Sequence, residues 1–598
     1  EHLRALAAGT RAGRPAPSLA LPAWEMLGGD PSGSRLAEPG VELARLAWGE
    51  VIGIPRLDAD DDFGLRRGMA LIPTSEFRPL FPVVSDGILY VHNGIALTAY
   101  NLFSRQPDRL WQFRVPPPNS EVMFDNRAIY APAVHDGRVY VNLITSVGGA
   151  EDQLGYVRVK FPIPRRALFA LDAWTGKVLW RLGGELRKEA LEEGASFATA
   201  PTPEGGRLYV GAIRQKESTD PFEHYVLCLD PATGKILWST FVASGGTEIN
   251  LFGNSTRESM GSPVAVTRDA VFYSTNHGAI AALEKKTGRL RWTYRYRQLT
   301  VMPTRSVYVT KNRLEWVNSP PMASGGVVAV APTDSSVLYA FDARTGRPLW
   351  ERARGRDVRT LYGAKGEVLV LGGDRLEFWD LRTGQGVAPP SGRELSGTGR
   401  GAVASDGVYV PCRDMLRKVG WDGSWDETAA RRWPGGAAEG GNLVVVDGAV
   451  ILASQDAIQV FFDRRDQEHA IREALARDPD DPALLYRGAL RFLQSGDADS
   501  AALLLARSAE ITAASKRPED ERLHRAARRR LYAVSMEQGR AELEAGRQEP
   551  ARERFRAARG WAADVAGRIE ASLYLARIHL VKREDSRAVD EYQRLLLE

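Results

Sequence analysis

Four segments of the chain share one pattern of apolar and polar positions: a strand-like run, a short turn and a second run that ends on tryptophan. In chain order they are LFALDAWTGKVLW (168–180), VLCLDPATGKILW (226–238), IAALEKKTGRLRW (280–292) and LYAFDARTGRPLW (338–350). Alternating apolar and polar residues predict a half-buried β-strand, and a Thr-Gly pair after an acidic residue predicts a hairpin turn. Each segment therefore predicts two antiparallel strands with a tryptophan at the end of the second.

Weaker copies extend this repeat in both directions. Each strong copy follows another β-prone run after a turn, such as HDGRVYV (135–141), so one repeat contains about four strands. Copies at 81–111, 366–387, 407–425 and 442–463 bring the count to eight, and the last lacks its outer strand. The stretch LARLAWGEVIGI (43–54) has strand character. We expect it to pair with residues around 456–462 and close the repeats into a ring without exposed sheet edges.

The phrase A-x-D-x-x-T-G-x-x-x-W resembles the repeat of the quinoprotein-type (PQQ-like) β-propeller family. It is nearly intact at 170–180, 228–238 and 340–350, with Cys228 in place of the alanine, and Glu284 replaces the aspartate at 282–292. The opening WEMLGGDPSGSR (24–35) is similar to the lead-in that such propellers often have. The resemblance covers roughly residues 21–463 and implies a mainly β fold, an eight-bladed β-propeller. A solenoid is the structural alternative.

Tryptophan holds the same place in the strong copies and in the copy upstream of them. A large ring at the end of an outer strand can fill the gap between neighbouring sheets. We therefore expect five side chains to pack one blade against the next: Trp111, Trp180, Trp238, Trp292 and Trp350.

The chain changes character after Asp463, where β-branched runs give way to Ala, Leu, Arg and Glu. Apolar residues recur at intervals of three and four, which predicts amphipathic helices. Residues 482–511 resemble a tetratricopeptide (TPR) repeat; two weaker copies follow, with an insertion expected near 516–525 and Arg583 in place of the last turn glycine. By resemblance, such an array offers a concave surface to other proteins. The predicted domains are a tail at 1–20, the propeller at 21–463 and a TPR-like helical array at 464–598.

Composition narrows the class of function. The 598 residues include 79 Lys and Arg against 75 Asp and Glu, a net charge of +4, so no basic field favours nucleic-acid binding. The two cysteines, Cys228 and Cys412, exclude a disulfide framework and a multi-cysteine metal site. No apolar run reaches the roughly 20 residues that a transmembrane helix needs. Since the sequence begins at Glu1, we expect that something precedes it and that a signal peptide or lipid anchor would lie there.

The resemblance also raises the hypothesis of a PQQ-dependent dehydrogenase. Such enzymes hold the quinone in the central funnel, with a catalytic Asp, a calcium ion bound by Glu, Asn and Asp, often two adjacent cysteines, and a tryptophan floor. In this chain the two cysteines fall in different repeats, and no catalytic phrase stands out. We therefore predict no catalytic residue, no cofactor-binding residue, no metal ligand and no cofactor.

Two groups of polar residues remain as candidates for binding. The first projects from a long loop on one propeller face: Glu248, Asn250, Asn254 and Arg257. This loop can bind an ion or a ligand, although we favour a solvated or partner-facing loop. The second shares one face of a predicted helix: Arg522, Arg525 and Arg529. This basic face can contact lipid phosphates or an acidic partner, whereas the balanced charge around it favours a solvated face.

Both predicted domains are architectures for interaction. We therefore predict a non-enzymatic scaffold or adaptor subunit that binds other protein subunits in a bacterial envelope assembly. By resemblance to PQQ-like propellers, which commonly work outside the cytoplasm, we expect it in the periplasm or at the outer membrane, with at most peripheral membrane contact. The alternative is a PQQ-dependent oxidoreductase or a sensor that binds a ligand in its funnel.

Overall fold

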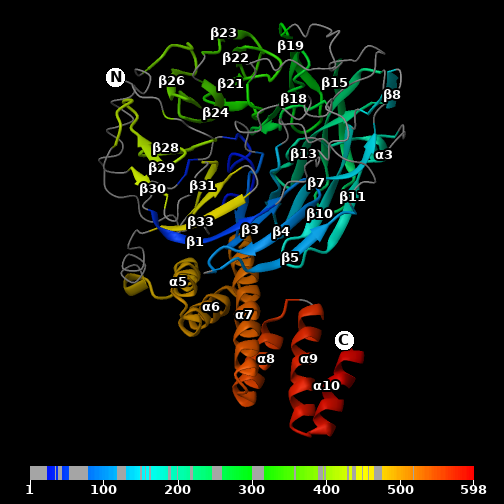
Figure 1. The fold of residues 1–598 in the computed structure, drawn as a ribbon, viewed down its shortest axis with the longest axis vertical. Helices are drawn as coiled ribbons and strands as arrows, with labels where there is room; N and C mark the ends of the chain where they lie inside the picture. Colours follow the sequence, from blue (N-terminus) through cyan, green and yellow to red (C-terminus); the bar gives the residue numbers. More distant parts are fainter. Residues whose placement is uncertain are drawn as a thin grey trace. The chain divides into compact units, whose positions relative to one another are not determined.

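The computed structural model describes residues 23–33, 36–37, 43–52, 79–116, 129–245, 259–299, 316–387, 395–433, 440–463 and 475–597, apart from short internal gaps of up to four residues. The chain divides into two compact units (Figure 1), one mainly of Pro22–Leu102 and Gln106–Arg464 and the other mainly of Arg465–Glu598. The first unit is built from β-sheets and the second from α-helices. The tail expected at 1–20 lies outside the described residues.

The first unit is an eight-bladed β-propeller, as the repeat predicts. From the innermost strand outward, blade 1 contains β2 (Val83–Ser85), β3 (Ile88–His92), β4 (Ala96–Asn101) and β5 (Arg109–Arg114); blade 2 contains β6 (Ala133–His135), β7 (Arg138–Gly148), β10 (Ile163–Asp172) and β11 (Val178–Leu182); blade 3 contains β12 (Thr202–Glu204), β13 (Arg207–Arg214), β14 (Phe222–Leu229) and β15 (Ile236–Gly245); and blade 4 contains β16 (Ala265–Val266), β17 (Ala270–Ser274), β18 (Ala279–Glu284) and β19 (Leu290–Arg295). A short helix, α3 (Leu191–Gly194), precedes blade 3.

The remaining four blades complete the ring. Blade 5 contains β20 (Met322–Ser324), β21 (Val327–Val330), β22 (Val337–Asp342) and β23 (Pro348–Ala353); blade 6 contains β24 (Val358–Lys365), β25 (Val368–Gly373) and β26 (Glu377–Asp380); blade 7 contains β27 (Ala402–Ala404), β28 (Gly407–Pro411), β29 (Met415–Val419) and β30 (Arg431–Arg432); and blade 8 contains β31 (Asn442–Val446), β32 (Ala449–Ala453), β33 (Ala457–Asp463) and β1 (Leu43–Val51).

Two blades depart from the simple four-stranded repeat. Blade 6 has three described strands, and where the fourth would lie Gly386 makes a single bridge to Trp379. Blade 2 has an inserted hairpin, β8 (Glu151–Leu154) with β9 (Val157–Lys160), between its two middle strands.

The ring closes through pairing of distant segments. Strand β1 runs antiparallel to β33, with Trp48 opposite Val460 and Val51 opposite Ala457. The expectation that residues 43–54 supply the missing outer strand of the last repeat is confirmed. The ring of Trp48 also contacts Tyr100 of blade 1, with ring centroids 5.4 Å apart, so β1 joins the last blade to the first.

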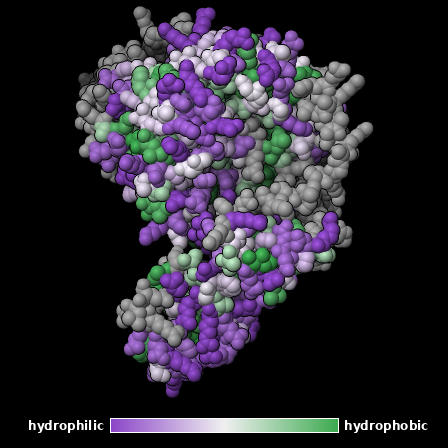
Figure 2. Space-filling view, turned by 180° about the vertical axis from the view of Figure 1, so that it is seen from behind, coloured by the Kyte–Doolittle hydropathy of each residue, from purple (hydrophilic) through white to green (hydrophobic). Residues whose placement is uncertain are grey.

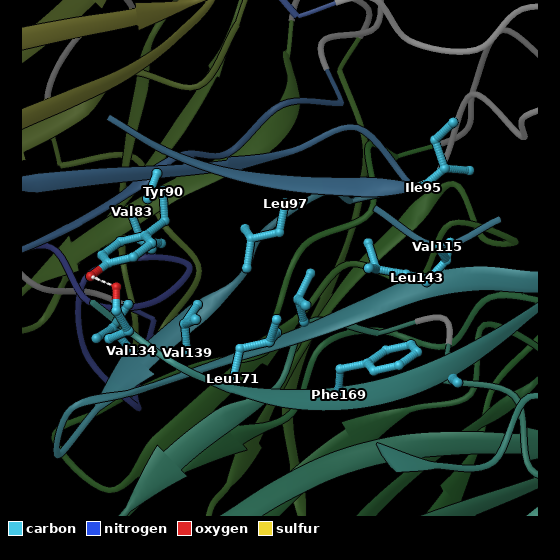
Figure 3. Close-up of a cluster of buried hydrophobic side chains, with 14 of the residues drawn as sticks. Val83, Tyr90, Ile95, Leu97, Val115, Val134, Val139, Leu143, Phe169 and Leu171 are labelled. Atoms are coloured by element: carbon cyan, nitrogen blue, oxygen red, sulfur yellow. Dashed lines mark hydrogen bonds between the residues drawn. The ribbon is translucent and has the colours of Figure 1, made fainter. Parts of the chain in front are cut away.

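The hydrophobic core lies between neighbouring blades. Middle strands such as β3 and β28 are buried along their whole length, because each of their faces meets another blade. Figure 3 shows the layer between blades 1 and 2, where Leu97 and Tyr90 of one blade lie near Val139, Leu171 and Phe169 of the next. A small sheet buried on both faces cannot be stable alone, so the stability of each blade depends on its neighbours.

The tryptophan of each outer strand lies against a glycine in the Thr-Gly turn of the following blade. The five pairs are Trp111–Gly176, Trp180–Gly234, Trp238–Gly288, Trp292–Gly346 and Trp350–Gly384. A Cβ added to any of these glycines would lie only 2.5–2.7 Å from the indole, and each glycine has a φ between +66° and +74°. Both the close approach and the left-handed backbone require glycine. We call these five contacts the tryptophan–glycine seams.

Hydrogen bonds reinforce the seams. In the first, the indole N–H of Trp111 donates to the carbonyl oxygen of Ala173 at 3.1 Å, and the Tyr90 hydroxyl donates to the same oxygen at 2.9 Å. The carboxylate of Asp172 accepts the backbone N–H of Thr175 at 2.9 Å and so fixes the turn that presents this oxygen. Trp238 differs, since its Nε1 has no hydrogen-bond partner among the described residues.

The second unit consists of six described helices: α5 (Pro482–Ser495), α6 (Ala498–Thr512), α7 (Pro518–Glu544), α8 (Gln548–Trp561), α9 (Val565–Val581) and α10 (Asp585–Leu597). Consecutive helices pack on one another, and small residues such as Ala489, Ala501 and Ala551 are buried at their contacts. The turn residues have positive φ, +86° at Gly496 and +58° at Arg583. The predicted helices are confirmed, and the insertion expected near 516–525 is the start of α7, which extends to 27 residues.

Removal of a seam ring should destabilise the propeller. We expect Trp238→Ala to lower the free energy of unfolding by about 3 kcal/mol, because the ring leaves a cavity between blades 3 and 4. Gly288→Ala should destabilise from the other side of the same contact, by about 1–2 kcal/mol or more, since its Cβ would meet the indole in a left-handed turn. Urea unfolding checks both variants. The control is Gly206→Ala, a left-handed turn glycine whose Cβ would meet nothing within 4 Å; equal losses for the two glycine variants would contradict the seam.

Removal of the closing strand should open the ring. A chain that begins at residue 58 lacks β1, and both β33 and the blade 1 face that Trp48 covers become exposed. Exposed strand edges pair with other molecules. We therefore expect this truncated chain to aggregate, as size-exclusion chromatography would show. A soluble monomer with an unchanged melting transition would contradict the closure.

Candidate functional site

The axis of the propeller is crossed by a segment of the chain itself. Residues 24–37 hydrogen-bond through their backbone to the innermost strands of four blades: Trp24 with Val84 of blade 1, Glu25 with Val134 of blade 2, Pro31 with Val266 of blade 4 and Ala37 with Val403 of blade 7. Because these blades lie on different sides of the ring, the segment crosses from one side of the ring to the other. We call its described residues, 24–33 and 36–37, the axial segment.

The glycines of WEMLGGDPSGSR give the axial segment its shape. Gly28, Gly29 and Gly33 all have positive φ, between +75° and +80°. A Cβ on Gly28 would lie 2.6 Å from the carbonyl oxygen of Gly33, so the loop folds tightly onto itself. This lead-in was recognised in the sequence, but its position on the axis was not predicted, because no local pattern indicates which strands it contacts.

Arg400 fastens the axial segment to the inner strands. It lines a small pocket together with Trp24, Phe81, Tyr362 and Asn442. Its Nη2 donates to the carbonyl oxygens of Gly33 and Tyr362, both at 3.0 Å. Burial lowers the pKa of Arg400 to about 10, an effect that nearby Asp30 opposes, so the guanidinium remains charged at neutral pH. These bonds to carbonyl oxygens hold the axial segment in place.

A second polar cluster lies between blades 3 and 4. The Ser259 hydroxyl lies 3.1 Å from Nε2 of His224 and 3.3 Å from Nδ1 of His277, and the Tyr273 hydroxyl lies 3.1 Å from Nδ1 of His224. Burial and then the charge of His277 hold the pKa of His224 well below its usual range. A serine beside a neutral imidazole is the pairing of a nucleophile with a base. Both side chains are fully buried in the described part of the chain, where they link blades 3 and 4.

Sequence reasoning missed this cluster as a group. The residues of the cluster come from three separate segments, and only the register between blades brings them together. His92 is fully buried at the end of β3, and neither ring nitrogen has a hydrogen-bond partner among the described residues. Burial and the charge of Arg166 lower its pKa to about 3.

The candidate residues from the sequence have different outcomes. Glu248, Asn250, Asn254 and Arg257 lie outside the described residues, which resume at Ser259. Arg522, Arg525 and Arg529 lie on α7, and each has at least one interaction within the chain. On the propeller, Trp292 and Trp350 are buried, while Trp111, Trp180 and Trp238 are half-buried.

The positions of the cysteines and of the metal-ligating residues bear on the hypothesis of a bound quinone with a calcium ion. Cys228 lies in blade 3 and Cys412 in blade 7, both buried as free thiols, so they form no adjacent pair. Within the described ranges, no group of three or more His, Cys, Asp or Glu is placed to bind a metal ion.

In the part of the chain that is described, no helix combines the length and the apolar character needed to span a membrane. On the face in Figure 2, hydrophobic residues form small patches among hydrophilic ones.

Acidification should destabilise the propeller through its buried histidines. In the unfolded chain His92 has a pKa near 6.5, whereas in the folded chain its pKa is about 3. Below pH 6.5 the unfolded chain therefore binds a proton that the folded chain does not, and stability falls by about 1 kcal/mol for each pH unit down to about pH 3. His92→Leu should reduce this dependence in urea unfolding at pH 7.0, 5.5 and 4.5, and half-buried His135→Leu is the control. The same slope in both variants would contradict the assignment.

Residues 223–470 match the family model described as "Outer membrane protein assembly factor BamB". Two curated relatives, each an "Alcohol dehydrogenase (quinone), dehydrogenase subunit", come from Komagataeibacter europaeus and Gluconacetobacter polyoxogenes. Each is 25% identical over 193 residues, which are 31% of this chain and 24% of the relative. The chain thus matches less than a third of the length of these relatives.

Solved structures similar to the chain include both kinds of protein. BamB from Moraxella catarrhalis is 17% identical, with a TM-score of 0.40, and the match covers 70% of this chain and 100% of that one. Quinohemoprotein alcohol dehydrogenase from Comamonas testosteroni is 15% identical, with a TM-score of 0.44, and the match covers 77% of this chain and 83% of that one. From its repeat phrase, its eight blades and the family match, the chain is a PQQ-like β-propeller repeat protein with a C-terminal helical array.

Proposed function

We propose that the protein is a non-enzymatic scaffold or adaptor subunit that binds other protein subunits in a bacterial envelope assembly. The observation that carries this proposal is the axial segment. The family's enzymes hold their quinone in the central funnel, and here the chain's own residues span that axis, bonded to blades 1, 2, 4 and 7. Binding surfaces are then left to the outside of the propeller and to the helices.

The family match supports the same function. The matched model is described as an assembly factor for outer membrane proteins, and its match spans the second half of the propeller. A periplasmic or outer-membrane-associated location is part of the proposal and follows from the same description.

The helical unit supplies a second surface suited to protein contacts. Helix α9 exposes three apolar residues on one face, Leu573, Leu580 and Val581. They lie at positions i, i+7 and i+8 of the helix, and the exposed Arg577 lies between them at i+4. Exposed apolar residues grouped on one face of a helix commonly mark an interaction site.

The similarity to quinone-dependent alcohol dehydrogenase subunits favours a second candidate, a quinoprotein oxidoreductase. The two candidates differ in a simple measurement, since only an oxidoreductase reduces a dye after addition of PQQ, Ca²⁺ and an alcohol.

Affinity capture from the native source tests the scaffold. The full chain should capture at least one protein stoichiometrically, and a chain that ends at residue 465 should fold and lose at least one partner. In the full chain, Leu573→Glu with Leu580→Glu should weaken that capture. Leu503→Glu is the matched control, because Leu503 is an exposed apolar residue on α6, outside this face. Native protein isolated with stoichiometric PQQ, or dye reduction by the reconstituted protein, would overturn the proposal in favour of the oxidoreductase.

A further inference from the structure

One outer strand differs from the others in charge. Among the eight outermost strands that the structure describes, β15 alone has no charged residue. It is also the longest of them, with ten residues, ILWSTFVASG. The others contain charges at the edge, such as Arg109 and Arg114 in β5, Arg181 in β11 and Glu351 in β23. Natural proteins protect sheet edges with such charges because an unprotected edge pairs with another strand.

Alignment of the outer strands on their tryptophans shows where the protection is missing. In each outer strand, three positions lie on the same exposed face: the residue before the tryptophan, the residue after it and the third residue after it. These residues are Leu110, Gln112 and Arg114 in β5, Arg291, Thr293 and Arg295 in β19, and Leu237, Ser239 and Phe241 in β15. Phe241 thus stands where two other blades have arginine, and it is 51% exposed.

The outer side of β15 is open within the described part of the chain. Strand β15 is the last strand of its sheet, after β14. Its inner-face residues are engaged with blade 4, where Trp238 forms a seam and the Thr240 hydroxyl donates to the carbonyl oxygen of Gly288 at 2.6 Å. Among the described residues, the outer backbone groups of β15 pair with no further strand, and Leu237, Ser239 and Phe241 are exposed, with the Phe241 ring 5.6 Å from that of Tyr225 in β14.

The strand is complementary to itself. In an antiparallel pair of two β15 strands centred on Ser239, Leu237 of each copy lies opposite Phe241 of the other. Aliphatic–aromatic pairs across strands are stabilising, and no like charges meet. A two-fold symmetric contact has this reciprocal form. The same arrangement of β19 would place Arg291 opposite Arg295 of the other copy.

We propose that β15 is a self-association edge, through which two copies of the chain pair antiparallel about Ser239. Irregularities in the pairing of β15 with β14 lie at the steps Ile236–Trp238 and Phe241–Ala243, so the regular stretch is short and runs from Trp238 to Phe241, with Ser239 inside it. A contact of this size falls below that of stable interfaces, and the dimer is therefore weak and dependent on concentration. The proposal does not depend on the scaffold function.

A crosslink tests the register. Ser239→Cys should form a disulfide-linked dimer under mild oxidation, because residues opposite each other in an antiparallel pair have Cα atoms about 4.5–5.5 Å apart, within the range of a disulfide. The native Cys228 and Cys412 are buried and should not contribute. The matched control is Gln112→Cys, at the same exposed position of β5, and it should stay monomeric on non-reducing gels.

Sedimentation velocity of the full chain tests the contact itself. The unmodified protein should shift from monomer towards dimer between about 1 and 200 µM, and Phe241→Arg should weaken this association about tenfold. The variant restores the residue found in β5 and β19, so it should fold, as an unchanged melting temperature would show. Leu237→Arg should act likewise, whereas Leu179→Arg on β11, at the same position and with the same 45% exposure, should not. A strictly monomeric chain, a dimer unaffected by Phe241→Arg, or equal crosslinking of the two cysteine variants would overturn the proposal.

Discussion

The contact between an indole and a glycine in the next blade sets the architecture of the propeller. Each tryptophan–glycine seam needs a ring at the end of one outer strand and a residue without a side chain in the following turn, so neither blade completes the contact alone. The turn's acidic residue, threonine and glycine serve the same purpose, since they present a carbonyl oxygen to the indole N–H. Because the contact links consecutive repeats, the spacing of the tryptophans follows the spacing of the blades.

The sequence predicted most of this architecture because its causes are local. The alternation of apolar and polar residues, the turn residues and the repeated tryptophan indicate the strands. The strand predicted at 43–54, which belongs to no repeat of its own, could be matched to the incomplete last repeat. The position of the axial segment could not be predicted, because Trp24, Glu25 and Pro31 bond through backbone atoms to strands far away in the sequence. The same holds for His224, Ser259 and His277, whose contacts depend on the register between blades. Phe241 is a different case, since the repeat alignment alone shows that two other blades have arginine at its position.

The axial segment and the outer edges divide the propeller into an inside and an outside with different chemistry. Inside, Arg400 and the glycine-rich loop use their polar groups on each other and on the inner strands. Outside, the edge strands are exposed to solvent, and single side chains decide whether an edge is protected from pairing with a strand of another molecule. This division favours the outer surfaces, and with them the helices, as the part of the molecule that meets other proteins.

Closure of the ring by β1 has a consequence for the order of folding. The strand that completes blade 8 precedes all the other described strands in the chain, and Arg400 hydrogen-bonds to Gly33, which lies 367 residues earlier. Contacts of such high sequence separation form late and slowly. During synthesis β1 therefore stays unpaired until the last repeat has been synthesised. A chaperone that covers the unpaired β1 would protect the nascent chain from aggregation at this stage.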